Sequence, residues 1–97
     1  MAAYVIVNVW VTDPELYREY AAGTPASIER FGGRFLVRGG PADVREGSWS
    51  PARVVVLEFP DGDAARAWYE SDEYQALLAI RQRAAEAELV IVEGVET

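Results

Sequence analysis

The pattern of apolar and polar residues predicts four β-strands. Each is a short run rich in β-branched and aromatic side chains, bounded by glycine, proline or aspartate. The runs AYVIVNVWV, RFLVR, ARVVVLEF and ELVIVEGV cover residues 3–11, 34–38, 52–59 and 88–95.

Charged and apolar residues alternate along RFLVR, with the period of two that is typical of a strand. This alternation predicts that Phe35 and Val37 share one face, and that Arg34, Leu36 and Arg38 share the other. After Pro41, the segment ADVREG at residues 42–47 could continue the strand as an edge, where proline is tolerated.

The first predicted helix follows the first strand. It begins at TDPE, either with a capping box from Thr12 to Glu15 or with Asp13 as N-cap before Pro14. Gly23 and the following TPAS segment predict a kink or a restarted helix, which ends near Phe31.

A second predicted helix begins after PDGD, with Asp61 or Asp63 as its N-cap. The segment SDEY, which begins at Ser71, has the composition of another N-cap. We therefore expect this helix to form in two pieces.

Two glycine pairs bracket the second strand in RFGGRFLVRGG. A phosphate-binding loop is one interpretation, but neither pair opens a helix or fits a phosphate-binding motif. We expect Gly32 to end the first helix in a left-handed conformation, and Gly39 and Gly40 to break or bulge the strand.

The elements follow the order strand, helix, strand, strand, helix, strand. This order predicts a single α+β domain over residues 1–97, with the ferredoxin-like fold. Such a fold has a four-stranded antiparallel sheet with its helices on one face.

The first strand is apolar on both of its predicted faces, with Val5, Val7 and Val9 on one and Ile6 and Trp10 on the other. Helices cover one face of such a sheet, so something else has to cover the second. We expect a homodimer that packs sheet against sheet and buries about 1,200–2,000 Å² or more. A peptide or a lipid on that face is the alternative.

Composition excludes several kinds of chemistry. The chain of 97 residues has no cysteine, histidine or lysine, so zinc thiolate sites, imidazole bases and Schiff-base lysines are absent. We expect no metal and no cofactor. The net charge of −7 argues against nucleic-acid binding, and the apolar runs are too short to span a bilayer. We expect a cytoplasmic protein.

Polar residues interrupt the apolar strands at Asn8, Glu58 and Glu93. Buried polar groups need partners. If the register brings these three residues and Arg38 onto one face, they form a charged cluster in a pocket between sheet and helices. The alternative is a structural pair of Arg38 with Glu58 at a strand end or at the dimer interface.

Three aromatic residues are further candidates for binding a small-molecule ligand. Tyr69 and Tyr74 flank the expected break in the second helix, where a hydroxyl could point into the pocket; packing in the core is the alternative. Trp49 lies in a loop, where it could cover a pocket or pack against a partner subunit.

Four segments that together cover essentially the whole chain carry a family resemblance: AAYVIVNVWVTDPELYREY, FGGRFLVRGG, ARVVVLEFPDGDAARAWYESDEYQAL and ELVIVEGV. In this combination the chain resembles the DUF1330 family of the dimeric α/β-barrel superfamily. Phe31 stands where family members often carry histidine before the glycine pair. The family has no established function. The superfamily resemblance implies cofactor-independent monooxygenases, isomerases or haem enzymes as relatives, although this chain has no histidine to ligate haem.

Two functional hypotheses follow. The first is a cofactor-independent enzyme for a small organic acid or aromatic compound, with Glu58 as general base, Arg38 as anion stabiliser, and Asn8 or Tyr69 as hydrogen-bond donor. The second is a non-catalytic homodimeric module that binds a small ligand or assists another protein, in which the polar strand residues fix the register.

Overall fold

The computed structural model describes residues 1–95, which form four strands and three helices. In chain order these are β1 (Ala3–Val11), α1 (Pro14–Arg30), β2 (Arg34–Arg38), β3 (Arg53–Phe59), α2 (Gly62–Glu70), α3 (Asp72–Ala84) and β4 (Ala85–Glu93). None of the helices within residues 1–95 has the length and hydropathy needed to span a membrane.

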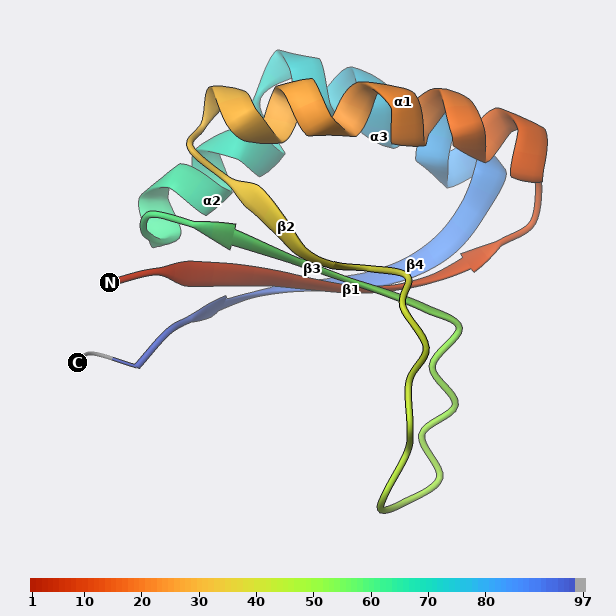
Figure 1. Cartoon of the computed structure of the whole chain (residues 1–97). Coiled ribbons are helices and arrows are strands. Elements are labelled where there is room, and N and C mark those ends of the chain that lie inside the picture. The colour runs from red at the N-terminus through yellow and green to blue at the C-terminus, as the bar shows by residue number, and fades with distance from the viewer. Residues whose placement is uncertain (96–97) are drawn as a thin grey trace.

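The strands form one antiparallel sheet in the order β2-β3-β1-β4. All three helices lie on the same side of this sheet (Figure 1). The predicted ferredoxin-like α+β fold is confirmed. The fourth strand begins at Ala85, three residues earlier than predicted, because the chain passes directly from α3 into β4.

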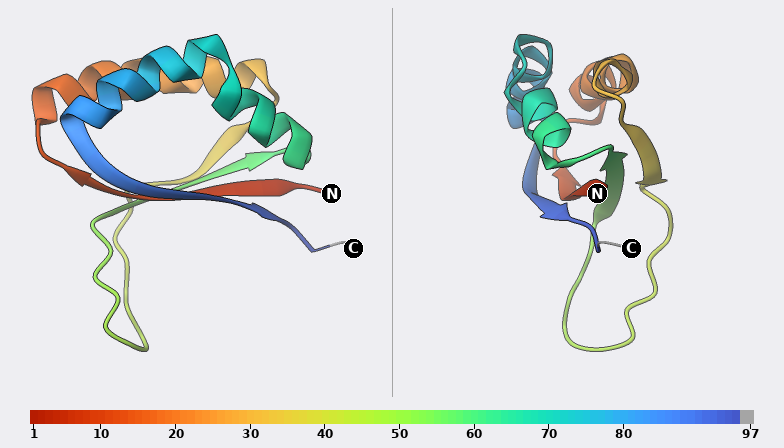
Figure 2. Two further views of the ribbon diagram at one scale, coloured as in Figure 1. Left: turned by 180° about the vertical axis from the view of Figure 1, so that it is seen from behind. Right: turned by 90° about the vertical axis from the view of Figure 1, so that its left-hand side faces the viewer.

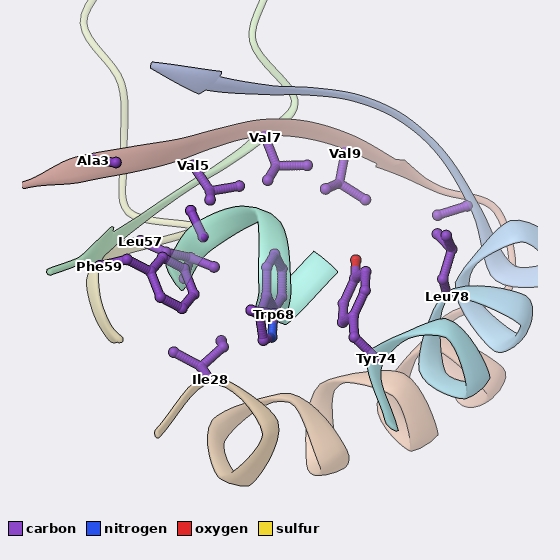
Figure 3. Packing of buried hydrophobic residues seen from close by; sticks show 12 residues of the cluster. Ala3, Val5, Val7, Val9, Ile28, Leu57, Phe59, Trp68, Tyr74 and Leu78 are labelled. Carbon is purple, nitrogen blue, oxygen red and sulfur yellow. The ribbon is translucent and has the colours of Figure 1, made fainter. Parts of the chain in front are cut away.

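Alternate residues of β1 form the inner, helix-facing side of the sheet. Ala3, Val5, Val7 and Val9 are all buried there. Large side chains from the helices and from β3 pack above them (Figure 3). The largest fully buried ones are Trp68, Tyr74, Phe59 and Ile28.

The predicted ends of α1 are confirmed. The amide of Leu16 donates to the Asp13 side chain, and Pro14 occupies the first turn. At the other end Gly32 has a φ of 79°, and its amide donates to the Glu29 carbonyl at 3.0 Å. Gly32 is therefore the left-handed residue that ends the helix.

The alternative of a restarted helix is wrong, because α1 continues through Gly23 and Pro25. Pro25 has no N–H and leaves the carbonyl of Ala21 without its helical donor. The Thr24 hydroxyl donates to this carbonyl at 3.1 Å, and Arg38 donates to it at 3.0 Å. These donors replace the missing hydrogen bond.

The predicted break between α2 and α3 is confirmed at Ser71, whose hydroxyl accepts from the Tyr74 amide at 3.1 Å. Asp61 caps α2 by accepting from the Ala64 amide at 2.7 Å. The two short helices therefore meet at an angle, and they bring Trp68 and Tyr74 against each other with ring centres 4.1 Å apart.

The predicted face assignment along β2 is wrong, because the register shifts between Phe35 and Val37. This β-bulge places Arg34 opposite Glu58 on the outer face, and Arg38 opposite Val55 on the inner face. After β2, residues 39–52 form a long loop instead of a continued strand. The loop extends beyond the sheet on the side opposite to the helices (Figures 1 and 2).

Replacing Gly32 by alanine should lower the free energy of unfolding by about 1–2 kcal/mol, because a Cβ disfavours the left-handed conformation. Equilibrium unfolding in urea measures this change. Gly40→Ala is the matched control, since Gly40 has no positive φ and a Cβ there would have no atom within 4 Å. Equal effects of the two substitutions would contradict the assigned role of Gly32.

Candidate functional site

A narrow pocket lies between the helical layer and the inner face of the sheet. Tyr17, Tyr20, Phe35 and Trp68 supply its aromatic wall, and Arg38 and Arg53 supply its charges. The space between its atoms is about 460 Å³ with the opening to solvent included, but the centre of a water molecule fits into only about 30 Å³ of it. The smaller volume limits what can bind without rearrangement, so a ligand with an aromatic ring has to displace side chains.

Arg38 reaches the pocket because the bulge in β2 turns its side chain to the inner face. One of its nitrogens, Nη2, donates to the carbonyl of Ala21 that Pro25 leaves free. Its guanidinium carbon lies 4.4 Å from the centre of the Phe35 ring. These contacts hold a cation at the rim without a carboxylate partner.

Arg53 supplies the second charge. It pairs with Val9 at the start of β3, and its guanidinium carbon lies 5.9 Å from the centre of the Tyr17 ring. Its Nε is buried and has no hydrogen-bond partner within residues 1–95. A buried N–H without an acceptor is costly and favours an incoming acceptor.

Tyr20 lines the pocket and is paired with Tyr74 of the core. The hydroxyls of Tyr20 and Tyr74 lie 2.8 Å apart, and Tyr74 is fully buried. Its ring points from α3 toward β1 (Figure 3). Burial raises the pKa of both phenols, and for Tyr20 the neighbouring Tyr74 raises it further. Both groups therefore remain neutral near pH 7.

Arg81 lies beside this pair. Its side chain is buried, with 6% of the residue exposed, and its guanidinium carbon lies 5.8 Å from the centre of the Tyr20 ring. It forms no ion pair with a carboxylate of residues 1–95. It lines a separate groove between α3 and β4.

The four polar strand residues do not form the expected cluster. By the strand register, Asn8 and Glu58 belong to the outer face of the sheet, while Arg38 and Glu93 belong to the inner face. The bulge at Leu36 is the reason, because it reverses the side on which Arg38 lies. Glu58 and Arg38 therefore do not meet in a pocket within one chain.

Each of the two outer-face residues has a structural partner. Glu58 accepts from Arg34 Nε at 2.8 Å and from the Tyr4 hydroxyl at 3.3 Å. The Asn8 side-chain oxygen accepts from the Ala52 amide at 3.0 Å, which fixes the end of the long loop. The predicted pair of Arg38 with Glu58 is replaced by Arg34 with Glu58.

The three aromatic residues that the sequence offered as ligand-binding candidates do not line one common pocket. Tyr74 packs in the core, and its hydroxyl reaches the pocket wall only through Tyr20. Tyr69 lines the groove between α3 and β4. Trp49 is 60% exposed and belongs to the long loop, which extends on the side of the sheet opposite to the helices. Tyr69 and Tyr74 thus lie side by side, with ring centres 5.4 Å apart, whereas Trp49 lines a hollow formed by the long loop.

Sequence reasoning missed four residues of these two cavities, namely Tyr17, Tyr20, Arg53 and Arg81 as ligand-facing groups. A signal exists for Arg81, which lies seven residues after Tyr74 and three after Leu78, on the apolar side of α3. An arginine at a buried helical position is unusual and marks a polar site in the interior.

The carboxylates of the chain are spread over its surface. Residues 1–95 contain no group of three or more acidic side chains that could hold a metal ion. Asp61 caps α2, and Asp63 pairs with Arg66 at 2.9 Å. The polar side chains that line the pocket are those of two arginines, two tyrosines and Thr24, and the arginines suit an anionic ligand.

Comparison with protein families identifies one match. The profile of a domain of unknown function, DUF1330, matches residues 2–95. The chain belongs to the DUF1330 family. The expected family resemblance is confirmed, and a comparison with curated proteins found no match.

Several solved structures resemble this DUF1330 chain. RPA0582 from Rhodopseudomonas palustris has 19% identity and a TM-score of 0.75, with 98% of this chain and 82% of that one covered. SnoaB, a cofactor-independent oxygenase from Streptomyces nogalater, has 18% identity and a TM-score of 0.69, with 99% and 95% covered. A dimeric ferredoxin-like protein of unknown function from Jannaschia sp. CCS1 has 15% identity and a TM-score of 0.72, with 97% and 100% covered. At these identities the similarity establishes the fold.

The raised phenol pKa values make stability depend on pH. A group with a raised pKa in the folded state contributes stability that is complete below its unfolded pKa, about 10 for tyrosine, and is lost as the pH rises through the folded pKa. We expect the free energy of unfolding to fall from about pH 10 upward, and less steeply in Tyr20→Phe. Urea unfolding at a series of alkaline pH values measures both slopes.

The ultraviolet absorbance of tyrosinate provides the control. All five tyrosines should ionise near pH 10 in the urea-unfolded chain, but fewer in the folded protein. Ionisation of all five at that pH in the folded protein would contradict the buried pair.

Proposed function

We propose that this protein binds a small organic acid with an aromatic ring, in its anionic form, in the pocket between the helices and the sheet. One observation supports this proposal: Arg38 and Arg53 lie at an aromatic pocket that no aspartate or glutamate of residues 1–95 lines. An anion there gains charge-assisted hydrogen bonds, and a flat ring packs against Tyr17 and Phe35.

The narrowness of the pocket sets the mode of entry. Arg38 is exposed and Arg53 is half-buried, so both side chains can move more readily than the core beneath them. A ligand that displaces Arg53 from above the Tyr17 ring also offers an acceptor to its Nε. We therefore expect binding to reorder the rim, while the aromatic wall stays in place.

A cofactor-independent enzyme is the second candidate, favoured by the similarity of the fold to the oxygenase SnoaB. Two arginines beside a bound acidic compound lower its pKa and stabilise the anion on which such chemistry depends. Glu58 lies on the other face of the sheet, so the base would not be Glu58 of the same chain. Oxygen uptake and product formation with bound hydroxylated aromatic acids separate catalysis from binding alone.

We propose that two copies pack through the outer faces of their sheets, as a homodimer. This face carries exposed apolar side chains, including Trp10, Val37, Val90 and Val92. The structural relatives from Jannaschia sp. and Thermobifida fusca are dimeric ferredoxin-like proteins. The long loop with Trp49 extends on the same side and would lie against the partner.

The binding proposal predicts that benzoate raises the melting temperature and that benzamide, its neutral counterpart, does not. Arg53→Gln should weaken benzoate binding at least about tenfold, because a hydrogen bond to a charged group contributes about 1.5–3 kcal/mol. Isothermal titration calorimetry measures the affinities.

Arg18→Gln is the matched control for this experiment. Arg18 is exposed on α1 and does not line the pocket, so the substitution removes the same charge elsewhere. Equal losses in the two variants would show that only net charge matters, and stabilisation by benzamide as strong as by benzoate would exclude an anion site.

The homodimer predicts twice the mass of one chain in sedimentation equilibrium. Val90→Glu should weaken the dimer at least about tenfold, because it places an unpaired charge at a buried interface. The same substitution at Val95, which is 86% exposed and lies beyond β4, is the control. A wild-type chain that remains monomeric at millimolar concentration contradicts the proposal.

A further inference from the structure

A groove lies between α3 and β4, two elements seen at the front of the left view in Figure 2. Its polar lining is Tyr69, Arg81, Gln82 and Glu86, and Leu89 is the one residue it shares with the pocket described above. Arg38 and Arg53 do not line it. The groove is therefore a separate opening into the layer between helices and sheet.

The burial of Arg81 is the unusual feature of this groove. Only 6% of the residue is exposed, and its Nε has no hydrogen-bond partner within residues 1–95. Glu86 is the one carboxylate of the groove lining, and it is exposed and forms no ion pair with Arg81. Burying a guanidinium without a counter-ion opposes folding.

The neighbours of Arg81 add hydrogen-bond donors. Arginine donates and never accepts, and the hydroxyls of Tyr20 and Tyr74 share one hydrogen bond between them. That bond uses one of the two hydroxyl protons, and the two phenol oxygens also accept from Arg81, whose N–H groups outnumber them. The cluster consequently has more donors than acceptors, and an oxygen anion is the ligand that would balance it.

We infer that Arg81, with Tyr20 and Tyr74 beside it, forms an anion site for the carboxylate of a small organic acid that enters through the groove between α3 and β4. The guanidinium supplies the charge and the planar pair of donors that a carboxylate accepts. Tyr69 and Gln82 line the approach and offer further donors.

The charge of this site comes from Arg81, which does not line the pocket of the proposed function, although Tyr20 is common to the two sites. Substitutions at Arg53 and Arg81 therefore distinguish the two. A loss of benzoate binding in Arg53→Gln alone would support the pocket and not the groove. A loss in Arg81→Met alone would support the groove and not the pocket.

The test follows the Nε–H signal of Arg81 by nuclear magnetic resonance, assigned by its absence in Arg81→Met. Benzoate should shift this signal saturably, and benzamide should not. Arg81→Met should weaken the binding measured at groove residues such as Gln82 at least tenfold, whereas Arg53→Gln should leave it unchanged. An unmoved signal at saturating benzoate, an equal response to benzamide or unaltered binding in Arg81→Met would overturn the inference.

A stability measurement shows whether Arg81→Met loses binding only because it fails to fold. Methionine keeps the apolar stem of Arg81 and removes a charge that has no counter-ion, so the urea midpoint of the ligand-free protein should stay the same or rise. A marked fall would show that Arg81 serves the fold, and would overturn the inference. Arg81→Lys, which keeps the charge but loses the planar donors, should retain part of the benzoate response.

Discussion

A series of aromatic rings between the helices and the sheet determines the rest of the structure. It runs from Phe59 through Trp68 and Tyr74 to Tyr20 and Tyr17, with successive ring centres between 4.1 and 6.2 Å apart. These rings hold α1 and α3 above the inner face of the sheet. At the Phe59 end they fill the layer, and at the Tyr17 end they leave the pocket. Tyr17, Tyr20 and Trp68 thus belong both to this series of rings and to the wall of the pocket.

Two irregularities of the backbone place a charge at that wall. Pro25 removes a donor from α1 and frees the carbonyl of Ala21, while the bulge in β2 turns Arg38 toward it. The two features complement each other, because the carbonyl can accept a second hydrogen bond beside that of Thr24 and the guanidinium supplies it. Helix α1 is thereby joined to the edge strand β2 in the absence of a ligand.

The sequence predicted the elements well, because their signals are local: the apolar density of β1, the aspartate cap before Pro14 and the left-handed Gly32 all act over a few residues. The candidate site could not be predicted in the same way. The side on which Arg38 lies depends on a bulge that only pairing with β3 reveals. The burial of Arg81 depends on how α3 packs on the sheet, and a period-of-two rule for strands contains neither fact.

The central claim is that the arginines facing this interior have no carboxylate partners in the part of the chain that the structure describes, because an anionic ligand supplies the acceptor. A crystal structure of the protein grown with 4-bromobenzoate tests it most directly, because anomalous scattering locates the bromine independently of the side chains. The account predicts a ring against Tyr17 and Phe35, with its carboxylate at Arg53. A closed pocket without bromine, in which the guanidinium of Arg53 bonds to protein groups or ordered water, would contradict it.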